Sequence, residues 1–216
     1  MARKNKLKKF AQLTTFENSF EFTPQMKGRW HSDYFQNQHP VTLELGCGTA
    51  QYTVSLAQMF PQRNFIGVDV KGDRIWQGAK DALELKLKNV AFLRIFIDFI
   101  PDYFEPGEVD EIWITFPDPY PKEPKQNKRL TSPFFLEQYR HILKPGAALH
   151  LKTDSFELYK FTKKILIADP EAHIRQDIFD LYQQTDIPDV LQIQTTYEKR
   201  HLAEARKIYY LQFTIN

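Results

Sequence analysis

The sequence contains a single cysteine, Cys47, among its 216 residues. This excludes an internal disulfide framework and a zinc site made of several cysteines, and it is typical of a protein from the reducing cytoplasm. No apolar run comes near the roughly 20 residues that cross a bilayer, so we expect no membrane-spanning segment. The basic N-terminus has no apolar stretch behind it, which argues against a secretory signal. The six histidines show no metal-ligand spacing, and we therefore expect no metal site.

Length and composition indicate one folded domain. With 42% hydrophobic and 14% aromatic residues, the chain has enough apolar material for a core. No internal repeat and no linker-like stretch divides it. We therefore predict a single domain over residues 1–216, as a monomer or a homodimer, with residues 1–20 as an N-terminal arm.

This arm is basic, whereas the rest of the chain is nearly balanced in charge. The formal net charge is +2, yet the first nine residues contain no acid and five bases, which are Arg3, Lys4, Lys6, Lys8 and Lys9. Such an arm suits a polyanion such as nucleic acid. The alternative is a solvated tail that only keeps the protein soluble.

Strand and helix patterns alternate along the chain. Apolar and β-branched runs predict strands at 41–45, 64–70, 90–97, 111–116, 147–153, 172–178 and 207–215. Helical spacing predicts helices at 49–60, 73–87, 132–143 and 156–168. This alternation implies an α/β protein whose parallel sheet has helices on both faces. Sheets of this kind bind ligands beyond the carboxyl ends of their strands.

The loop after the first predicted strand has the features of a nucleoside-cofactor site. Gly46 and Gly48 allow a tight turn and the close approach of a ligand. Asp69 ends the next strand, where a carboxylate can accept the hydroxyl protons of a ribose. Gln51 stands in place of the third glycine of a dinucleotide motif, which argues against a dinucleotide. Glu44 would repel a pyrophosphate but attract the ammonium and sulfonium groups of S-adenosylmethionine.

The pattern of Glu44, Gly46 and Gly48 followed by Asp69 resembles the S-adenosylmethionine-dependent methyltransferases of class I. The resemblance implies a Rossmann-like fold with a seven-stranded, mostly parallel sheet, helices on both faces and an antiparallel last strand. Residues 207–215 would form that last strand.

A proline-rich segment, Phe116–Lys122, follows the fourth predicted strand. Its three prolines alternate with Phe116, Asp118 and Tyr120, and we expect them to hold these residues in extended conformations. The segment would then aim Asp118 and Tyr120 at the carboxyl edge of the sheet. A rigid exit from the strand would explain the prolines alone, but an acid and an aromatic side chain beside a cofactor crevice favour a functional role.

Motifs spread over nearly the whole chain resemble the bacterial tRNA (guanine-N7-)-methyltransferase family. They are Phe116–Lys122, Asn127–Leu130, Thr153–Asp154 and Thr195–Glu198, together with the basic segment Lys4–Phe10. The resemblance implies transfer of a methyl group from S-adenosylmethionine to N7 of a guanine in tRNA, at nucleotide 46 of the variable loop.

The resemblance also implies roles for individual residues. Glu44, Asp69 and Asp118 match positions that bind the cofactor, and Asp118 matches the catalytic aspartate. The positions that match RNA contacts are Lys122, Asp154, Thr195, Tyr197 and Glu198.

Two positions depart from the family pattern. Ala50 stands where a third glycine is frequent, and Phe96 stands where an acid is usual. Asp98 is two residues further on and would lie on the same face of an extended segment. Either Asp98 replaces the missing acid at the adenine, or Phe96 packs on the adenine and the polar contact is lost.

The residue types suit methylation at N7, because this nitrogen carries a lone pair and no proton and needs no general base. Positioning then provides much of the acceleration. Asp118 can stabilise the positive charge that moves to the base. Asp154 and Glu198 are candidates for reading the donors on the Watson–Crick edge of guanine, while Tyr120 or Tyr197 can stack on an extruded base.

Two other functions stay open at this point. One is a methyltransferase of the same fold that acts on an exocyclic amine. The other is an RNA-binding protein without activity, although the intact set of Glu44, Asp69 and Asp118 argues against it. The basic segment 122–129 can follow an RNA backbone, whereas the late cluster of Lys199, Arg200, Arg206 and Lys207 fits a solvated face.

Overall fold

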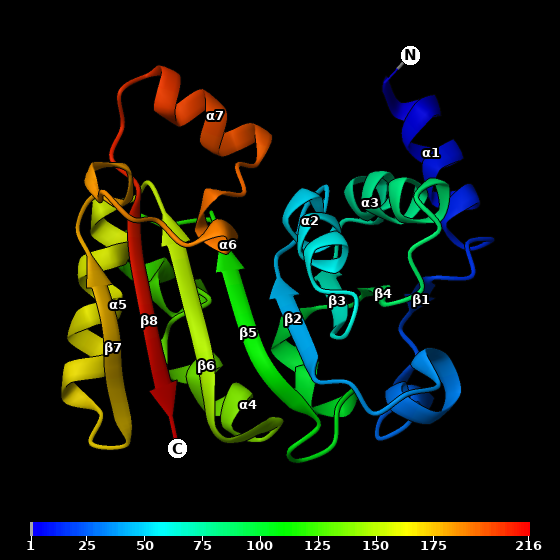
Figure 1. The fold of residues 1–216 in the computed structure, drawn as a ribbon, viewed down its shortest axis with the longest axis horizontal. Coiled ribbons are helices and arrows are strands. Elements are labelled where there is room, and N and C mark those ends of the chain that lie inside the picture. Colours follow the sequence, from blue (N-terminus) through cyan, green and yellow to red (C-terminus); the bar gives the residue numbers. More distant parts are fainter. Residues whose placement is uncertain (1) are drawn as a thin grey trace.

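The computed structural model describes residues 2–216, with side chains from Asn5 onward. Within this range eight strands form one sheet in the order β1-β4-β3-β2-β5-β6-β8-β7 (Figure 1). The strands are β1 Ser19–Glu21, β2 Val41–Leu45, β3 Asn64–Asp69, β4 Val90–Arg94, β5 Val109–Thr115, β6 Leu143–Thr153, β7 Ala172–Ile178 and β8 Tyr209–Ile215. Only β8 runs against its neighbours β6 and β7 within these residues, so the mostly parallel sheet and its antiparallel last strand are confirmed.

The sheet has one strand more than the seven that the sequence pattern predicts. The additional strand, β1, pairs in parallel with β4 at the edge of the sheet. It has three residues, which is too short for a periodic pattern to be visible in the sequence.

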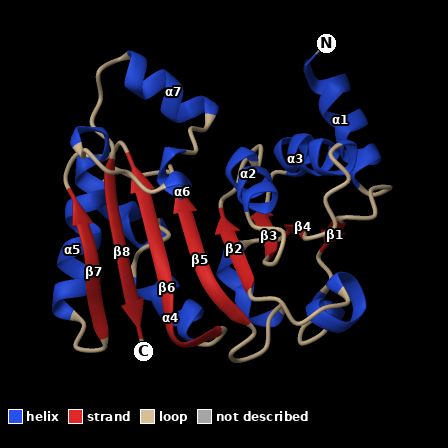
Figure 2. Cartoon of the chain, in the orientation of Figure 1, coloured by secondary structure: helices blue, strands red, loops and turns tan. Residues whose placement is uncertain are grey.

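Helices cover both faces of the sheet (Figure 2). They are α1 Ala2–Leu13, α2 Gln51–Met59, α3 Gly72–Glu84, α4 Pro133–Arg140, α5 Phe156–Ala168, α6 Asp189–Gln192 and α7 Thr196–Ala203. Shorter helical turns cover Pro24–Met26, Trp30–Phe35, Ile97–Asp102, Glu123–Lys128 and Leu181–Gln183. In Figure 1, α6 and α7 lie above the carboxyl ends of β5 and β6. Within residues 2–216, no helix combines the length and apolar character that a membrane span requires.

Alternation along the central strands divides the core into two layers. On β5, Ile112 and Ile114 pack toward α4 and α5, whereas Trp113 packs toward α2. Both layers are fully buried at the centre, as expected for a parallel sheet that is covered on both faces. This arrangement fixes the strand ends, and therefore the loops that follow them.

The basic N-terminal segment forms helix α1, which packs against α3. Phe10 lies so close to Gly72 that a Cβ atom there would come within 2.6 Å of the ring. Lys6 pairs with Asp73 at 3.5 Å, and the ammonium group of Lys9 lies 4.5 Å from the ring centre of Trp76. The side chains of Arg3 and Lys4 lie outside the described residues. That this arm contacts RNA stays a prediction, and the arm would do so as a helix packed against α3.

Candidate functional site

The loops after β2, β3, β4 and β5 enclose a cavity of about 490 Å³ at the carboxyl ends of the strands. Four of the predicted site residues line it together, namely Gly46, Asp69, Asp98 and Asp118. The volume lies in the usual range for a small-molecule site. Among the described residues, no group of three or more His, Cys, Asp or Glu side chains is placed to hold a metal ion.

The glycine loop turns back on the end of β3. The backbone N–H groups of Gly46 and Cys47 both donate to the carbonyl of Val68, at 2.8 and 3.0 Å. Gly46 and Gly48 have φ angles of +73° and +56°, which is the left-handed region that favours glycine. A Cβ atom at Gly48 would meet nothing within 4 Å, so the loop is open on that side. Ala50 also adopts a left-handed φ, of +56°, just before α2.

Asp69 connects this loop to the start of α3. Its Oδ2 accepts a hydrogen bond from the N–H of Gly48 at 2.9 Å, and its Oδ1 accepts one from the N–H of Lys71 at 2.9 Å. The residue is 8% exposed and lines the cavity. Because a carboxylate has about four acceptor sites, Asp69 keeps capacity for two hydroxyl groups of a ligand.

Glu44 lies beneath the loop and is not among the residues that line the cavity. Its carboxylate accepts from the backbone N–H of Thr53 at 2.9 Å, from the Thr53 hydroxyl and from the Thr115 hydroxyl at 2.6 Å. Burial raises the pKa of Glu44 to about 7, against the effect of these hydrogen bonds. The side chain thus ties α2 to the end of β5, and its direct contact with a cofactor stays a prediction.

The sequence interpretation missed three residues of α3 and its entry. Lys71 and Arg74 line the cavity. Gly78 lets α3 approach the glycine loop, because a Cβ atom there would lie 2.5 Å from that of Ala50. For Gly78 the sequence did contain a signal, because a glycine inside a helical pattern often marks close packing.

The segment after β5 is bent, and the prediction of extended conformations at Phe116 and Tyr120 is wrong. Their φ angles are +48° and +41°, both left-handed. The N–H of Phe116 donates to the carbonyl of Lys152 at 2.8 Å, and the guanidinium of Arg129 donates to the carbonyls of Pro119 and Tyr120. These bonds offset the steric preference that the prolines impose on the residues before them.

This bend still brings Asp118 and Tyr120 to the cavity, where Phe96 and Asp98 lie as well. Burial raises the pKa of the Tyr120 hydroxyl, and the charges of Asp118 and Asp98 raise it further. Both candidates for the adenine contact, Phe96 and Asp98, therefore line the same cavity, and the choice between them stays open.

The late motif that begins at Thr195 forms the start of α7. The Thr195 hydroxyl caps the helix by accepting from the N–H of Glu198 at 3.2 Å. The Glu198 carboxylate is 0% exposed, and its Oε1 lies 2.7 Å from Nζ of Lys152 and accepts from the Tyr182 hydroxyl at 2.7 Å. Burial raises the pKa of Glu198, and Lys152 opposes this. Its contact with guanine stays a prediction, because the carboxylate is turned inward in this structure.

The other predicted RNA contacts lie outside the cavity lining. Tyr197 is 53% exposed and Lys122 is exposed. Asp154 directly follows β6, and its Oδ2 lies 3.0 Å from Nη1 of Arg206. The side-chain carbonyl of Gln51, at the start of α2, accepts from the N–H and from the hydroxyl of Thr196, at 2.7 and 2.9 Å. The glycine loop and the late motif are therefore directly connected.

Comparison with known proteins places this arrangement in a family. The family profile described as "Putative methyltransferase" matches residues 38–211. The tRNA (guanine-N(7)-)-methyltransferase of Bacteroides thetaiotaomicron is 46% identical over 98% of this chain and 86% of its own. That of Christiangramia forsetii is 44% identical over the full length of both chains. The chain belongs to the tRNA (guanine-N(7)-)-methyltransferase family.

Solved structures support the fold of this tRNA (guanine-N(7)-)-methyltransferase family member. The 16S rRNA methyltransferase KamB covers 86% of this chain and 92% of its own, with a TM-score of 0.64 and 16% identity. A 16S rRNA (adenine(1408)-N(1))-methyltransferase from Catenulisporales acidiphilia, described with its cosubstrate SAM, covers 85% of this chain and 88% of its own with a TM-score of 0.60 and 14% identity. The fold is therefore the Rossmann-like fold of class I methyltransferases.

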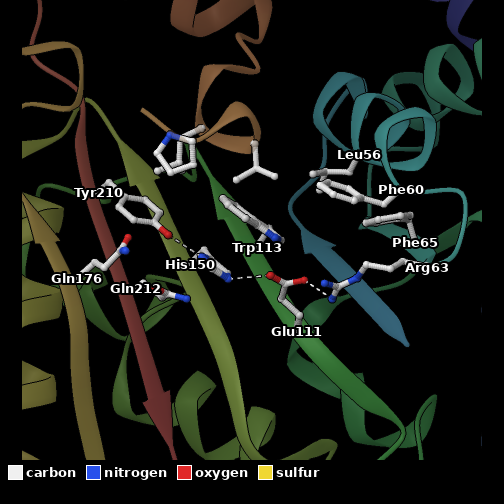
Figure 3. A pocket seen from close by; sticks show the side chains of 13 residues that line it. Leu56, Phe60, Arg63, Phe65, Glu111, Trp113, His150, Gln176, Tyr210 and Gln212 are labelled. Atoms are coloured by element: carbon white, nitrogen blue, oxygen red, sulfur yellow. Dashed lines mark hydrogen bonds and ion pairs between the residues drawn. The ribbon is translucent and has the colours of Figure 1, made fainter. Parts of the chain in front are cut away.

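This methyltransferase also has a second cavity, of about 220 Å³, on the face of the sheet that α2 covers (Figure 3). A row of polar side chains crosses its floor. The Tyr210 hydroxyl lies 2.8 Å from Nδ1 of His150, and Nε2 of His150 lies 2.9 Å from Glu111. Glu111 in turn pairs with Arg63, and the rings of His150 and Trp113 stack with centres 3.9 Å apart.

Proposed function

We propose that this protein transfers the methyl group of S-adenosylmethionine to N7 of guanine 46 in the variable loop of tRNA. The observation that carries the proposal is the family membership over the full length of the chain, combined with the cavity in which Asp69 and Asp118 meet. The relatives' names supply the tRNA and the guanine nitrogen, and the residues of the cavity suit that chemistry.

The cavity fits S-adenosylmethionine, which supplies an electrophilic methyl group on a sulfonium when it is bound. Gly46 lines the cavity, and the Cβ side of Gly48 is open, with no atom within 4 Å. Asp69 has free acceptor capacity for the ribose hydroxyls. Phe96, which is half exposed at the cavity, offers a flat apolar surface for an adenine, with Asp98 nearby in the same lining.

Asp118 is the proposed catalytic residue. Its carboxylate lies at the cavity between Phe116 and Tyr120, both in strained left-handed conformations that fix the turn. A fixed negative charge there favours the movement of positive charge onto the guanine ring. No proton has to leave N7, so Asp118 acts by charge and position rather than as a base.

The proposed RNA surface surrounds the cavity entrance. Lys122 offers an exposed charge for phosphate, and the exposed ring of Tyr197 offers a stacking platform for a base. Asp154 is the more accessible of the two candidates for the guanine edge, since Glu198 is buried. Thr195 and Glu198 then contribute by holding α7 in place.

The test is direct methylation. The protein is incubated with labelled S-adenosylmethionine and an unmodified tRNA transcript, and the methyl group is mapped. We expect one methyl group per tRNA at guanine 46, as a product that borohydride and aniline cleave. A tRNA with adenine at nucleotide 46 is the matched control and should accept none. An aniline-resistant product would identify an exocyclic amine as the target instead, and tRNA binding with no methyl transfer would identify an RNA-binding protein without activity.

A further inference from the structure

Arg129 is a buried arginine beside the proposed catalytic segment. It follows the helical turn Glu123–Lys128 and is 3% exposed, although the residues of that turn are mostly exposed. Burial lowers the pKa of its guanidinium. A side chain buried to this degree cannot reach a phosphate, so Arg129 differs in role from its basic neighbours Lys125 and Lys128.

The guanidinium bonds to backbone rather than to an acid. Its Nε donates to the carbonyl of Pro119 at 2.9 Å, and its Nη2 donates to the carbonyl of Tyr120 at 3.1 Å. Its Cζ atom lies 4.4 Å from the ring centre of Phe161 on α5. The guanidinium thus lies over a ring while its fork binds two consecutive carbonyls, a geometry that the single ammonium of lysine does not reproduce.

These carbonyls belong to a strained turn. Tyr120 has a φ of +41° and Phe116 a φ of +48°, and such conformations of bulky residues persist only when their surroundings hold them. The bond from the N–H of Phe116 to Lys152 holds one end of the turn. Arg129 holds the other end, and Asp118 lies between the two.

We propose that Arg129 is a positioning residue, which fixes Asp118 and Tyr120 at the cavity by binding the carbonyls of Pro119 and Tyr120. It touches neither cofactor nor RNA. The expected effect on methylation rests on the proposed function. The expected effect on the mobility of residues 116–122 does not depend on it.

The experiment compares Arg129→Lys with Arg140→Lys. Arg140 is a matched control, because its Nε also donates to a backbone carbonyl, that of Asn216 at 2.8 Å, at the end of α4. The first readout is hydrogen–deuterium exchange of residues 116–128. We expect faster exchange there in Arg129→Lys and wild-type exchange there in Arg140→Lys. Wild-type exchange in Arg129→Lys would overturn the proposal, whatever the protein's activity.

The second readout is single-turnover methylation at saturating cofactor and tRNA. Arg129→Lys should lower the rate about 10- to 100-fold through misplacement of Asp118, with both binding affinities close to wild type. A loss of tRNA affinity that accounts for the whole loss of rate would contradict a positioning role and indicate an RNA contact. Wild-type protein without methylation activity would count against the proposed function, while the exchange data would still decide the role of Arg129.

A chemical rescue sharpens the assignment. In Arg129→Ala, added methylguanidinium should restore part of the lost rate, because it can occupy the space above Phe161 and bind the same carbonyls. Thermal unfolding shows whether this variant folds, and Arg129→Lys carries the test if it does not. Absence of rescue in a folded Arg129→Ala protein that has lost activity would count against the proposal.

Discussion

The cavity at the strand ends and the cavity on the α2 face both contain charged side chains, but they differ in how these are bonded. At the carboxyl ends of the strands, Asp98 and Asp118 line the cavity, and neither carboxylate takes part in a side-chain hydrogen bond or salt bridge with the described residues, whereas Asp69 accepts only from two backbone N–H groups. On the α2 face, Glu111 accepts from Thr42 and pairs with Arg63 and His150. One cavity therefore has acceptor capacity directed at a ligand, whereas the other uses its polar groups to bond its own walls.

The difference is visible in the backbone as well. The cavity at the strand ends is built from loops that contain left-handed residues, Phe116 and Tyr120 among them. The second cavity is built on regular strands, where Glu111 and His150 stand on neighbouring β5 and β6. Strained conformations concentrate where geometry serves a function, so the first cavity is the better candidate for chemistry.

The largest effect should come from Asp118→Asn, which keeps the size of the side chain and removes its charge. We expect the single-turnover rate at saturating tRNA to fall about 100- to 1000-fold, in the range found when one electrostatic stabiliser is removed. Affinities for cofactor and tRNA should stay close to wild type, because the charge matters most in the transition state. A wild-type rate would remove Asp118 from the reaction.

Glu44→Gln tests the carboxylate beneath the glycine loop. With a pKa of about 7 in the folded state against an ordinary 4.5, Glu44 holds its proton in the folded protein while the unfolded chain releases it. Its contribution to stability is therefore present below pH 4.5 and is lost as the pH rises to 7. Relative to wild type, the free energy of unfolding of Glu44→Gln should rise by about 3 kcal/mol from pH 4.5 to pH 8.

Denaturant unfolding at several pH values measures this difference. Glu84→Gln, on the exposed side of α3, should show a constant offset from wild type over the same range. A constant offset for Glu44→Gln as well would contradict the raised pKa of Glu44.

Much of the fold and of the first cavity could be predicted from the sequence, because both depend on local signals. The predicted strand 172–178 matches β7, and Gly46, Asp69 and Asp118 all line one cavity as strand-end positions should. Parallel strands bring their carboxyl ends to one edge, so spacing along the chain translates into proximity.

The features that the sequence did not reveal arise from contacts between distant segments. The conformations of Phe116 and Tyr120 depend on Arg129 and Lys152, which local proline rules do not include. The burial of Glu198 depends on Lys152 of β6, whose ammonium also donates to the carbonyls of Leu191 and Ile193. A motif shows which residues recur together, but not whether a carboxylate points outward to RNA or inward to a lysine.

Asp69→Ala tests whether the cavity at the strand ends binds the cofactor. Each hydrogen bond to a charged group is worth about 1.5 to 3 kcal/mol, so loss of one or two ribose contacts should weaken S-adenosylmethionine binding by roughly 10- to 100-fold for each contact. Calorimetry measures the affinity, and tRNA binding without cofactor should hardly change. Asp81→Ala, further along α3, is the control and should bind cofactor as wild type does. An unaltered affinity for S-adenosylmethionine in a folded Asp69→Ala protein would contradict the proposed contact between Asp69 and the ribose.

Glu111→Gln tests whether the cavity on the α2 face serves stability alone. Removing the charge between Arg63 and His150 should lower the free energy of unfolding by about 2 kcal/mol. The single-turnover rate of the folded protein should stay at the wild-type value, since the second cavity takes no part in the proposed reaction. A reduced rate without a loss of stability would instead link this cavity to catalysis.

The smallest effect should come from helix α1, whose exposed charges lie outside both cavities. Replacing Lys6 and Lys8 by Gln removes two exposed charges and keeps Phe10, which docks the helix on α3. If both lysines neutralise phosphates, tRNA affinity should weaken modestly, and the slope of log affinity against log salt should become shallower by about 1.5.

The control replaces Lys86 and Lys88 by Gln. It removes the same charge just before β4, at the end of the strands opposite to the cofactor cavity. Cofactor affinity should be unchanged in both pairs. Equal salt slopes for the two pairs would mean that α1 keeps the protein soluble without touching RNA.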